Sequence, residues 1–223
     1  MRSLPASLLA VTERSSVAPP DLAARQLLGT LEGLMRGGVR WVWFRERDLA
    51  PDERRALARD VVDLVGARGG FVSIGGDPAL ALDLGAEGVH LPGGATPVDV
   101  ASARERLPRG CLGVSAHGLA EVEAAARAGA DYVTLSPIFA TASKPGYGPA
   151  LGPQALTAAA AFRIPVIALG GITPDRVGLC REAGAAGIAV MGGLMRSPDP
   201  EAEARAYGAS LDVRSGRSGS GRG

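Results

Sequence analysis

Cysteine is scarce in this chain of 223 residues, which carries only Cys111 and Cys180. Two cysteines are too few for a disulfide scaffold, and their positions fit no metal-binding spacing. The sequence also has no apolar run of the ~20 residues that a membrane span needs, and its first residues lack the apolar core of a signal peptide. We therefore expect a protein of the cytoplasm with reduced thiols.

An excess of charge is missing as well. The chain has 24 Lys and Arg against 23 Asp and Glu, a net charge of +1. No global field attracts nucleic acid or a membrane surface, so neither is expected as a partner. Hydrophobic residues make up 46% and charged residues 21%, which is ordinary globular usage and excludes wholesale disorder.

Short apolar runs bounded by turn residues recur along the whole chain. Several are nearly continuous in Val, Ile and Leu, as in strands buried on both faces. The expected strands are 8–13, 40–46, 70–75, 87–92, 111–117, 131–137, 165–171 and 187–193. Segments of helical character lie between them, for example at 21–38, 51–70, 119–130 and 173–185.

Alternating strands and helices imply parallel strands with right-handed crossovers. Eight such units at this length match a compact (β/α)8 TIM barrel, an α/β single domain over residues 1–213. Residues 214–223, rich in Arg, Gly and Ser, are expected to form a flexible tail. A doubly wound sheet is the rival fold, but it would place a glycine-rich phosphate loop after the first strand, where this chain reads RSSVAPP.

Polar residues follow the carboxyl ends of the expected strands, where barrel enzymes carry their active sites. His117 is the expected catalytic residue, because an imidazole can accept and return a proton near neutral pH. Arg45 and Arg47 flank Glu46 at a period of two, so both arginines face one side of the strand and Glu46 the other. The expected substrate-binding residues are Arg45, Arg47, His90, Ser115, Ser136 and Lys144, the last being the one lysine of the chain.

Two glycine pairs end the seventh and eighth expected strands. Glycine lets an anion approach the backbone closely, and the loops after these two strands are the recurrent phosphate site of barrels. The alternative is that glycine only turns the chain from strand to helix. We expect phosphate at Gly170, Gly171, Gly192 and Gly193.

The ordered set VWFRER, ALDLGAEGVHLPGG, LGVSAH, AGADYVTLSPIFATASKPGYG and IPVIALGGITPDR resembles the thiamine phosphate synthase superfamily. The resemblance covers nearly residues 8–207 and implies a (β/α)8 barrel. Synthases of this superfamily join a pyrimidine diphosphate to a thiazole phosphate with Mg²⁺, using an Asn-Asp pair after strand 3 and an acidic residue after strand 4. Here those places hold Gly75–Gly76 and residues 92–95, Pro-Gly-Gly-Ala, without the oxygen ligands that Mg²⁺ needs.

The thiazole tautomerase branch looks closer, because it carries an Arg-Glu-Arg, a His-Leu-Pro and a histidine at the corresponding strand ends. This resemblance implies an isomerase of thiamine biosynthesis that aromatises a carboxythiazole phosphate by proton transfer, with no metal and no cofactor. The implied partner is a small thiazole phosphate, and a homo-oligomer is compatible with the sequence. Two alternatives stay open: a thiamine phosphate synthase, and a non-catalytic member that only binds a thiazole phosphate.

Overall fold

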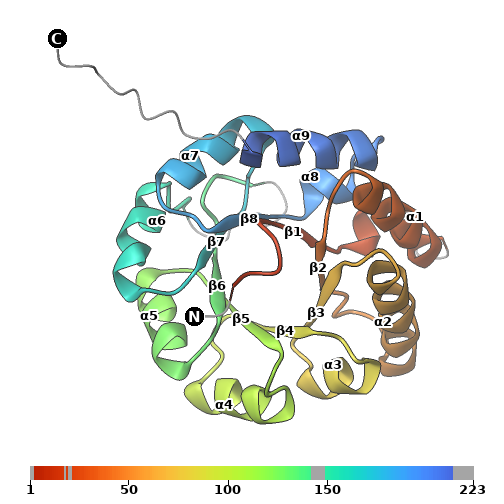
Figure 1. Cartoon of the computed structure of the whole chain (residues 1–223), viewed down its shortest axis with the longest axis horizontal. Helices are drawn as coiled ribbons and strands as arrows, with labels where there is room; N and C mark the ends of the chain where they lie inside the picture. The colour runs from red at the N-terminus through yellow and green to blue at the C-terminus, as the bar shows by residue number, and fades with distance from the viewer. Residues whose placement is uncertain (1–2, 18, 20–21, 142–148, 213–223) are drawn as a thin grey trace.

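Eight parallel strands close into a barrel in the computed structural model, which describes residues 3–17, 19, 22–141 and 149–212 (Figure 1). The strands are β1 (Leu8–Val11), β2 (Trp41–Phe44), β3 (Phe71–Gly75), β4 (Gly88–Leu91), β5 (Cys111–Ala116), β6 (Tyr132–Leu135), β7 (Val166–Leu169) and β8 (Gly187–Val190). Each strand pairs with the next along the chain, and β8 pairs with β1. The predicted (β/α)8 barrel is confirmed, and each observed strand lies within the run expected for it.

Helices surround the barrel on its outer side (Figure 1). They are α1 (Ala23–Arg36), α2 (Pro51–Gly66), α3 (Pro78–Leu84), α4 (Pro97–Arg106), α5 (Leu119–Ala128), α6 (Gln154–Ala159), α7 (Val177–Glu182), α8 (Gly192–Met195) and α9 (Pro200–Asp212). Short 3-10 helices occupy Arg14–Ser16, Ala160–Phe162 and Pro174–Arg176. In Figure 1 α9 lies beside α1, so the last described helix meets the first one. The expected tail at 214–223 lies outside the described residues.

Local sequence explains where several helices begin. Proline, which lacks the N–H that a first helical turn leaves unpaired, is the first residue of α2, α3 and α4. Asp77 accepts a hydrogen bond from the Leu80 N–H at 2.9 Å and so caps α3. Thr96 and Asp99 form a reciprocal capping box at the start of α4. These start signals fix where each strand-to-helix loop ends.

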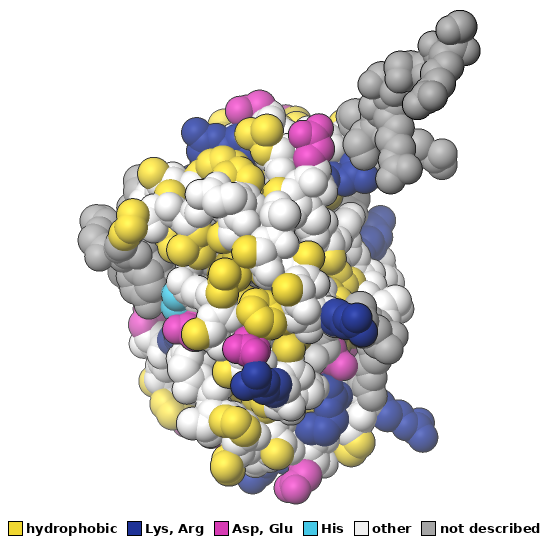
Figure 2. Space-filling view, turned by 90° about the vertical axis from the view of Figure 1, so that its left-hand side faces the viewer, with side chains coloured by type: hydrophobic (Ala, Val, Ile, Leu, Met, Phe, Trp, Pro, Cys, Tyr) yellow, Lys and Arg dark blue, Asp and Glu magenta, His cyan; other side chains and the backbone are white. Residues whose placement is uncertain are grey.

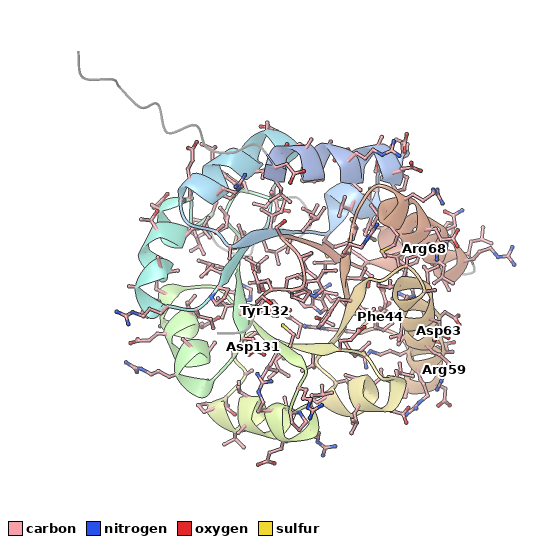
Figure 3. The ribbon with its side chains drawn as sticks, in the orientation of Figure 1. Phe44, Arg59, Asp63, Arg68, Asp131 and Tyr132 are labelled. Carbon is pink, nitrogen blue, oxygen red and sulfur yellow. The ribbon has the colours of Figure 1, made fainter. Side chains whose placement is uncertain are left out.

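Side chains alternate between the two faces of the barrel wall. Phe44 points outward and packs under the helices, while the strand neighbours Trp41 and Trp43 point into the barrel with Tyr132. Figure 3 shows Tyr132 inside the ring of strands, Phe44 between the ring and α2, and Arg59 on the outside of α2. The interior is therefore a packed layer and not a pore, as in other barrels of this kind.

The surface carries charges of both signs. Figure 2 shows Lys and Arg interspersed with Asp and Glu on one face, with hydrophobic side chains scattered between them. Within the described ranges, none of the helices is long and apolar enough to cross a membrane.

Candidate active site

A cavity of about 740 Å³ opens at the carboxyl ends of the strands. Most of the residues that the sequence singled out line this cavity. They are Arg45, Arg47, Ser115, His117, Ser136, Gly170, Gly171, Gly192 and Gly193. Lys144 lies outside the described residues, and His90 lies below the cavity. The polar and glycine residues that follow the expected strands thus locate this cavity. The binding and catalytic roles assigned to them stay predictions.

Four guanidinium groups line the cavity. Arg45 and Arg47 follow β2, as expected, and Arg176 and Arg196 follow β7 and β8. The sequence reading missed these last two, because neither stands at a strand end. The signal for Arg176 was its place five residues beyond the second glycine of the β7 loop.

Protein contacts hold these arginines in place. The backbone N–H of Arg45 donates to Thr12 Oγ1 at 2.9 Å. Arg176 Nη1 donates to the carbonyl oxygen of Gly171 at 2.8 Å, and its guanidinium lies over the Phe139 ring at 4.8 Å from the centroid. Arg196 is half exposed and lies 3.9 Å from the Glu13 carboxylate. Positioned guanidinium groups of this kind bind phosphate and carboxylate oxygens through paired hydrogen bonds.

Glu46 lies on the other face of the chain from Arg45 and Arg47, as the alternation predicts. Its side chain is 3% exposed, and both carboxylate oxygens accept from the Arg14 N–H, at 3.1 and 3.2 Å. Burial raises the pKa of Glu46 above its ordinary value. This carboxyl group ties the β1 loop to the β2 loop and takes no part in lining the cavity.

The glycine pairs have structural reasons of their own. Gly170 and Gly171 both have positive φ, +96° and +63°. A Cβ at Gly171 would lie 2.9 Å from the Phe139 carbonyl oxygen, and one at Gly193 would lie 2.7 Å from the Tyr207 hydroxyl oxygen. The close approach of neighbouring chain segments therefore accounts for these glycines already, and a phosphate role at either pair remains a prediction.

His117 is held at the rim by two hydrogen bonds. Its backbone N–H donates to Glu121 Oε2 at 2.8 Å, and its Nδ1 lies 3.0 Å from the Ser136 carbonyl oxygen. A carbonyl oxygen only accepts, so Nδ1 carries a proton. Nε2 then accepts a hydrogen bond when the ring is neutral and donates one when the ring is protonated.

His90 corrects the sequence expectation of direct contact with substrate. Its side chain is fully buried, and the Trp43 ring lies against it with 3.8 Å between the centroids and a tilt of 35° between the ring planes. Burial, together with the nearby charges of Arg47 and Arg45, lowers the pKa of His90 to about 3. The sequence reading placed it at the rim because β4 ends only one residue later; it could not show that the ring packs into the layer below.

The rim after β3 and β4 contributes no acidic side chain to the lining of the cavity. A Cβ at Gly75 would lie 2.8 Å from the Phe44 carbonyl oxygen and 2.9 Å from Trp43 Nε1. The indole of Trp43 thus occupies the place into which a side chain at position 75 would point. Its Nε1 is buried and, among the described residues, has no hydrogen-bond partner.

Asp77, the next carboxylate along the chain, is fully engaged. Besides capping α3, it accepts a hydrogen bond from Arg54 Nη1 at 3.0 Å. Arg54 also donates to the carbonyl oxygens of Glu46 and Gly75, at 3.0 and 2.6 Å. The three bonds tie the ends of β2 and β3 to the start of α3, away from the cavity.

Comparison with known proteins places this geometry in a family. The family model described as thiamine monophosphate synthase matches residues 8–194. The chain belongs to this family. A protein of Geobacter sulfurreducens, provisionally named thiamine-phosphate synthase, is 40% identical over 210 residues, which cover 93% of this chain and 95% of that protein. The thiamine-phosphate synthase of Geobacillus thermodenitrificans is 37% identical and covers 81% of this chain and 83% of its own length.

A solved structure agrees on the fold. The thiamine phosphate pyrophosphorylase from Pyrococcus furiosus superposes with a TM-score of 0.79 at 23% identity, covering 92% of this chain and 95% of that one. The expected resemblance to the superfamily is confirmed.

The expected isomerase is wrong. Relatives at 36–40% identity, such as those of Geobacter sulfurreducens and Thioalkalivibrio sulfidiphilus, are named thiamine-phosphate synthase, which is a transferase, and not thiazole tautomerase. The short motifs that favoured the tautomerase branch are strand-end residues such as Arg45, His90 and His117. One of these, His90, is a buried structural residue in this fold, so its presence does not separate one activity from the other.

The residues at the mouth do not fit the Mg²⁺ that synthases of the superfamily use. Two carboxylates line the cavity, from Glu121 and Glu203. Glu121 already accepts from the His117 N–H, and α9, which carries Glu203, lies on the side of β8 and not of β3. Across the described part of the chain, no group of three or more His, Cys, Asp and Glu side chains could hold a metal ion.

Proposed function

We propose that this family member is a thiamine-phosphate synthase, which joins a pyrimidine carried as its diphosphate to a thiazole phosphate and releases diphosphate. The observation that carries the proposal is the set of guanidinium groups around one cavity, in a chain that matches synthases along most of its length. Both substrates and the leaving group are anions that such groups bind.

The arginines come from two parts of the rim. Arg45 and Arg47 follow β2, whereas Arg176 and Arg196 follow β7 and β8. Two groups of cations suit two anionic reactants held side by side, because each reactant then brings its own charge to its own partners. Holding the reacting atoms close together in one cavity supplies much of the rate in a two-substrate reaction.

Guanidinium groups also act on the leaving group. Negative charge develops on the diphosphate as its bond to the pyrimidine carbon breaks, and fixed cations stabilise that charge. His117, held at the rim by Ser136 and Glu121, is one of several cavity residues that can hydrogen-bond the departing diphosphate. The arginines thereby take over the neutralisation of charge that a metal ion would otherwise supply.

The direct test is formation of thiamine phosphate from the two substrates by the purified full chain, measured with Mg²⁺ and with a chelator. We expect product in both conditions. Arg176→Met is the site variant and Arg59→Met, which removes the same charge from the outside of α2, is its control. Product formation that is absent in wild type, or equal in wild type and Arg176→Met, contradicts the proposal.

A second candidate is a member that binds a thiazole phosphate without turning it over. The observation that favours it is the rim after β3 and β4, where Gly75 stands beside the Trp43 indole and no carboxylate faces the cavity. Calorimetric binding of thiazole phosphate by a chain that forms no product under either condition selects this candidate.

A further inference from the structure

One methionine stands at the mouth of the barrel beside a cavity arginine. Met191 follows β8 directly, and it lines the cavity. Its sulfur lies 4.0 Å from Nη1 of Arg45, which comes from the end of β2. Figure 1 shows β8, β1 and β2 side by side in the ring, so this contact crosses the end of β1.

The short helix α8 holds the backbone of Met191 in place. The carbonyl oxygen of Met191 accepts hydrogen bonds from the N–H groups of Leu194 and Met195, at 3.2 and 2.9 Å. The side chain packs against the apolar interior of the barrel as well as lining the cavity. The place of the sulfur beside Arg45 is therefore set by an ordered turn of the chain.

The other sulfur atoms of the described chain are enclosed. Met35 and Met195 are each 2% exposed, whereas Met191 is partly exposed. Cys111 is 7% exposed and Cys180 is fully buried. Burial also raises the pKa of the Cys180 thiol to about 11, so very little of the reactive thiolate forms there near neutral pH. Among the described residues, an oxidant in solution therefore meets the thioether of Met191 first.

Oxidation of this sulfur changes what it offers to Arg45. A thioether is a weak hydrogen-bond acceptor, so Arg45 loses little when it turns from Met191 to a bound anion. A sulfoxide carries a strongly polar oxygen on the same sulfur. Because that oxygen accepts a strong hydrogen bond from a guanidinium group, it competes with the oxygens of a ligand for the same donor.

We propose that Met191 is an oxidation site through which peroxide lowers the affinity of the cavity for an anionic ligand. The thioether sulfur takes one oxygen atom from hydrogen peroxide, the O–O bond breaks, and the second oxygen leaves as water. Sulfur is oxidised by two electrons, and the peroxide is reduced by the same two. The sulfoxide oxygen then binds Arg45 and holds it from the ligand. A thiol-dependent methionine sulfoxide reductase reverses the change.

The oxidation follows from the exposure of one sulfur and does not depend on which reaction the chain catalyses. Only the effect on ligand binding rests on the proposed function, through the assignment of Arg45 to an anionic reactant. Inorganic diphosphate, which that reaction releases, is therefore the probe. Its binding is measured without any turnover.

Peptide mass spectrometry shows which sulfur reacts when the folded full chain is treated briefly with hydrogen peroxide. We expect one added oxygen on Met191 well before Met35 or Met195 gains one. Met191 and Met195 are four residues apart, so fragment masses of the peptide that carries both tell them apart. Equal rates at the three methionines contradict the proposal.

Calorimetry with inorganic diphosphate, before and after peroxide, gives the second readout. In the wild-type chain peroxide should weaken binding about tenfold, because one charge-assisted hydrogen bond is diverted. Met191→Leu, which keeps the size of the side chain without the sulfur, should have the same affinity before and after treatment. Met195→Leu, the matched change at a buried methionine, should stay as sensitive to peroxide as wild type.

A further variant tests the role of the oxygen without any oxidant. Met191→Gln carries a carbonyl oxygen on the side-chain atom that corresponds to the sulfur of methionine, and a carbonyl oxygen is a good acceptor. Untreated Met191→Gln should therefore bind diphosphate more weakly than untreated Met191→Leu. Equal affinities of the two variants contradict the competition for Arg45.

The outcomes separate this proposal from the proposed function, which formation of thiamine phosphate decides on its own. Equal loss of diphosphate binding in peroxide-treated wild type and Met191→Leu overturns the proposal even in an active synthase. A wild-type chain that does not bind diphosphate overturns it too. Selective oxidation of Met191, with a loss of affinity that Met191→Leu abolishes and the reductase reverses, supports it even where no thiamine phosphate forms.

Discussion

The two histidines of this chain lie in two layers of one barrel. His90 on β4 is level with Gly113 on β5, and His117 follows four residues further along the same direction. The deeper ring is enclosed by Trp43 and Tyr132, while the other stands at the cavity rim. The interior layer holds a neutral ring between fixed partners, whereas the other ring lines the cavity and is held by the Ser136 carbonyl oxygen. Depth in the barrel, and not residue type, decides what surrounds each histidine.

The largest expected effect is the loss of folding stability when acid protonates His90 in the interior layer. The pKa of His90 is about 3 in the folded chain against an ordinary value of 6.5. The unfolded chain therefore binds the extra proton first, and the stability is complete above about pH 6.5 and falls as the pH drops toward 3. Urea unfolding should show a loss of up to about 1.4 kcal/mol per pH unit, several kcal/mol in all. His90→Gln should flatten this slope, and an equal slope in both proteins contradicts the burial argument.

The next largest effect concerns His117, the histidine at the cavity rim, and the rate of the reaction. His117→Asn removes the imidazole but little volume, so folding should be nearly unchanged. A positioned imidazole typically contributes about 10²–10⁴ in rate, and we expect kcat to fall about a hundredfold with a small change in KM. Steady-state formation of thiamine phosphate measures both. A near-wild-type kcat would remove His117 from the chemistry.

A smaller loss is expected for the cation of the β7 loop. Arg176→Met should weaken binding of thiazole phosphate by roughly 1.5–3 kcal/mol, or about ten- to a hundredfold, because it removes a charge-assisted hydrogen bond. Calorimetric titration beside Arg59→Met tests this. Comparable affinities of the two variants would show that Arg176 only braces the Gly171 carbonyl.

The smallest effect concerns a buried hydroxyl at the edge of the site. Tyr207 donates to the Ile172 carbonyl oxygen at 2.9 Å, and burial raises the pKa of Tyr207 to about 12. Tyr207→Phe keeps the ring and loses one hydrogen bond, so the free energy of unfolding should fall by about 1 kcal/mol. That corresponds to about 2–4 °C in Tm for a chain of this size. A shift well beyond this range would mean that Tyr207 holds the β7 loop through more than one bond.

Much of the fold could be predicted because its signals are local. Each strand is a short apolar run with glycine or polar residues at its ends, and the run alone sets its ends to within three residues of those observed. Arg45 and His117 reach the mouth for the same reason. The depth of His90 could not be predicted, because it depends on the register between β4 and β5, which no local pattern encodes. The hydrogen bond between Tyr132 and His90 joins residues 42 apart and escaped sequence reading for the same reason.

The expected isomerase activity was wrong for a different reason. Short motifs at strand ends describe a barrel mouth, and related enzymes share such a mouth whatever reaction they catalyse. Similarity along nearly the whole chain, at 36% identity over 208 residues to one synthase, weighs more than a few positions. Arg176 and Arg196 are cavity residues that the motifs alone did not single out.

The indole of Trp43 beside Gly75 limits the substitutions open to this protein. A side chain at position 75 meets both the indole and the Phe44 carbonyl oxygen, so a single change there is harmful. Shortening Trp43 alone would open a hole in the layer that covers His90. A polar side chain can therefore be placed at Gly75 only together with a second substitution at Trp43, and each of the two changes alone destabilises the fold. Single substitutions therefore tend to leave this rim without a carboxylate.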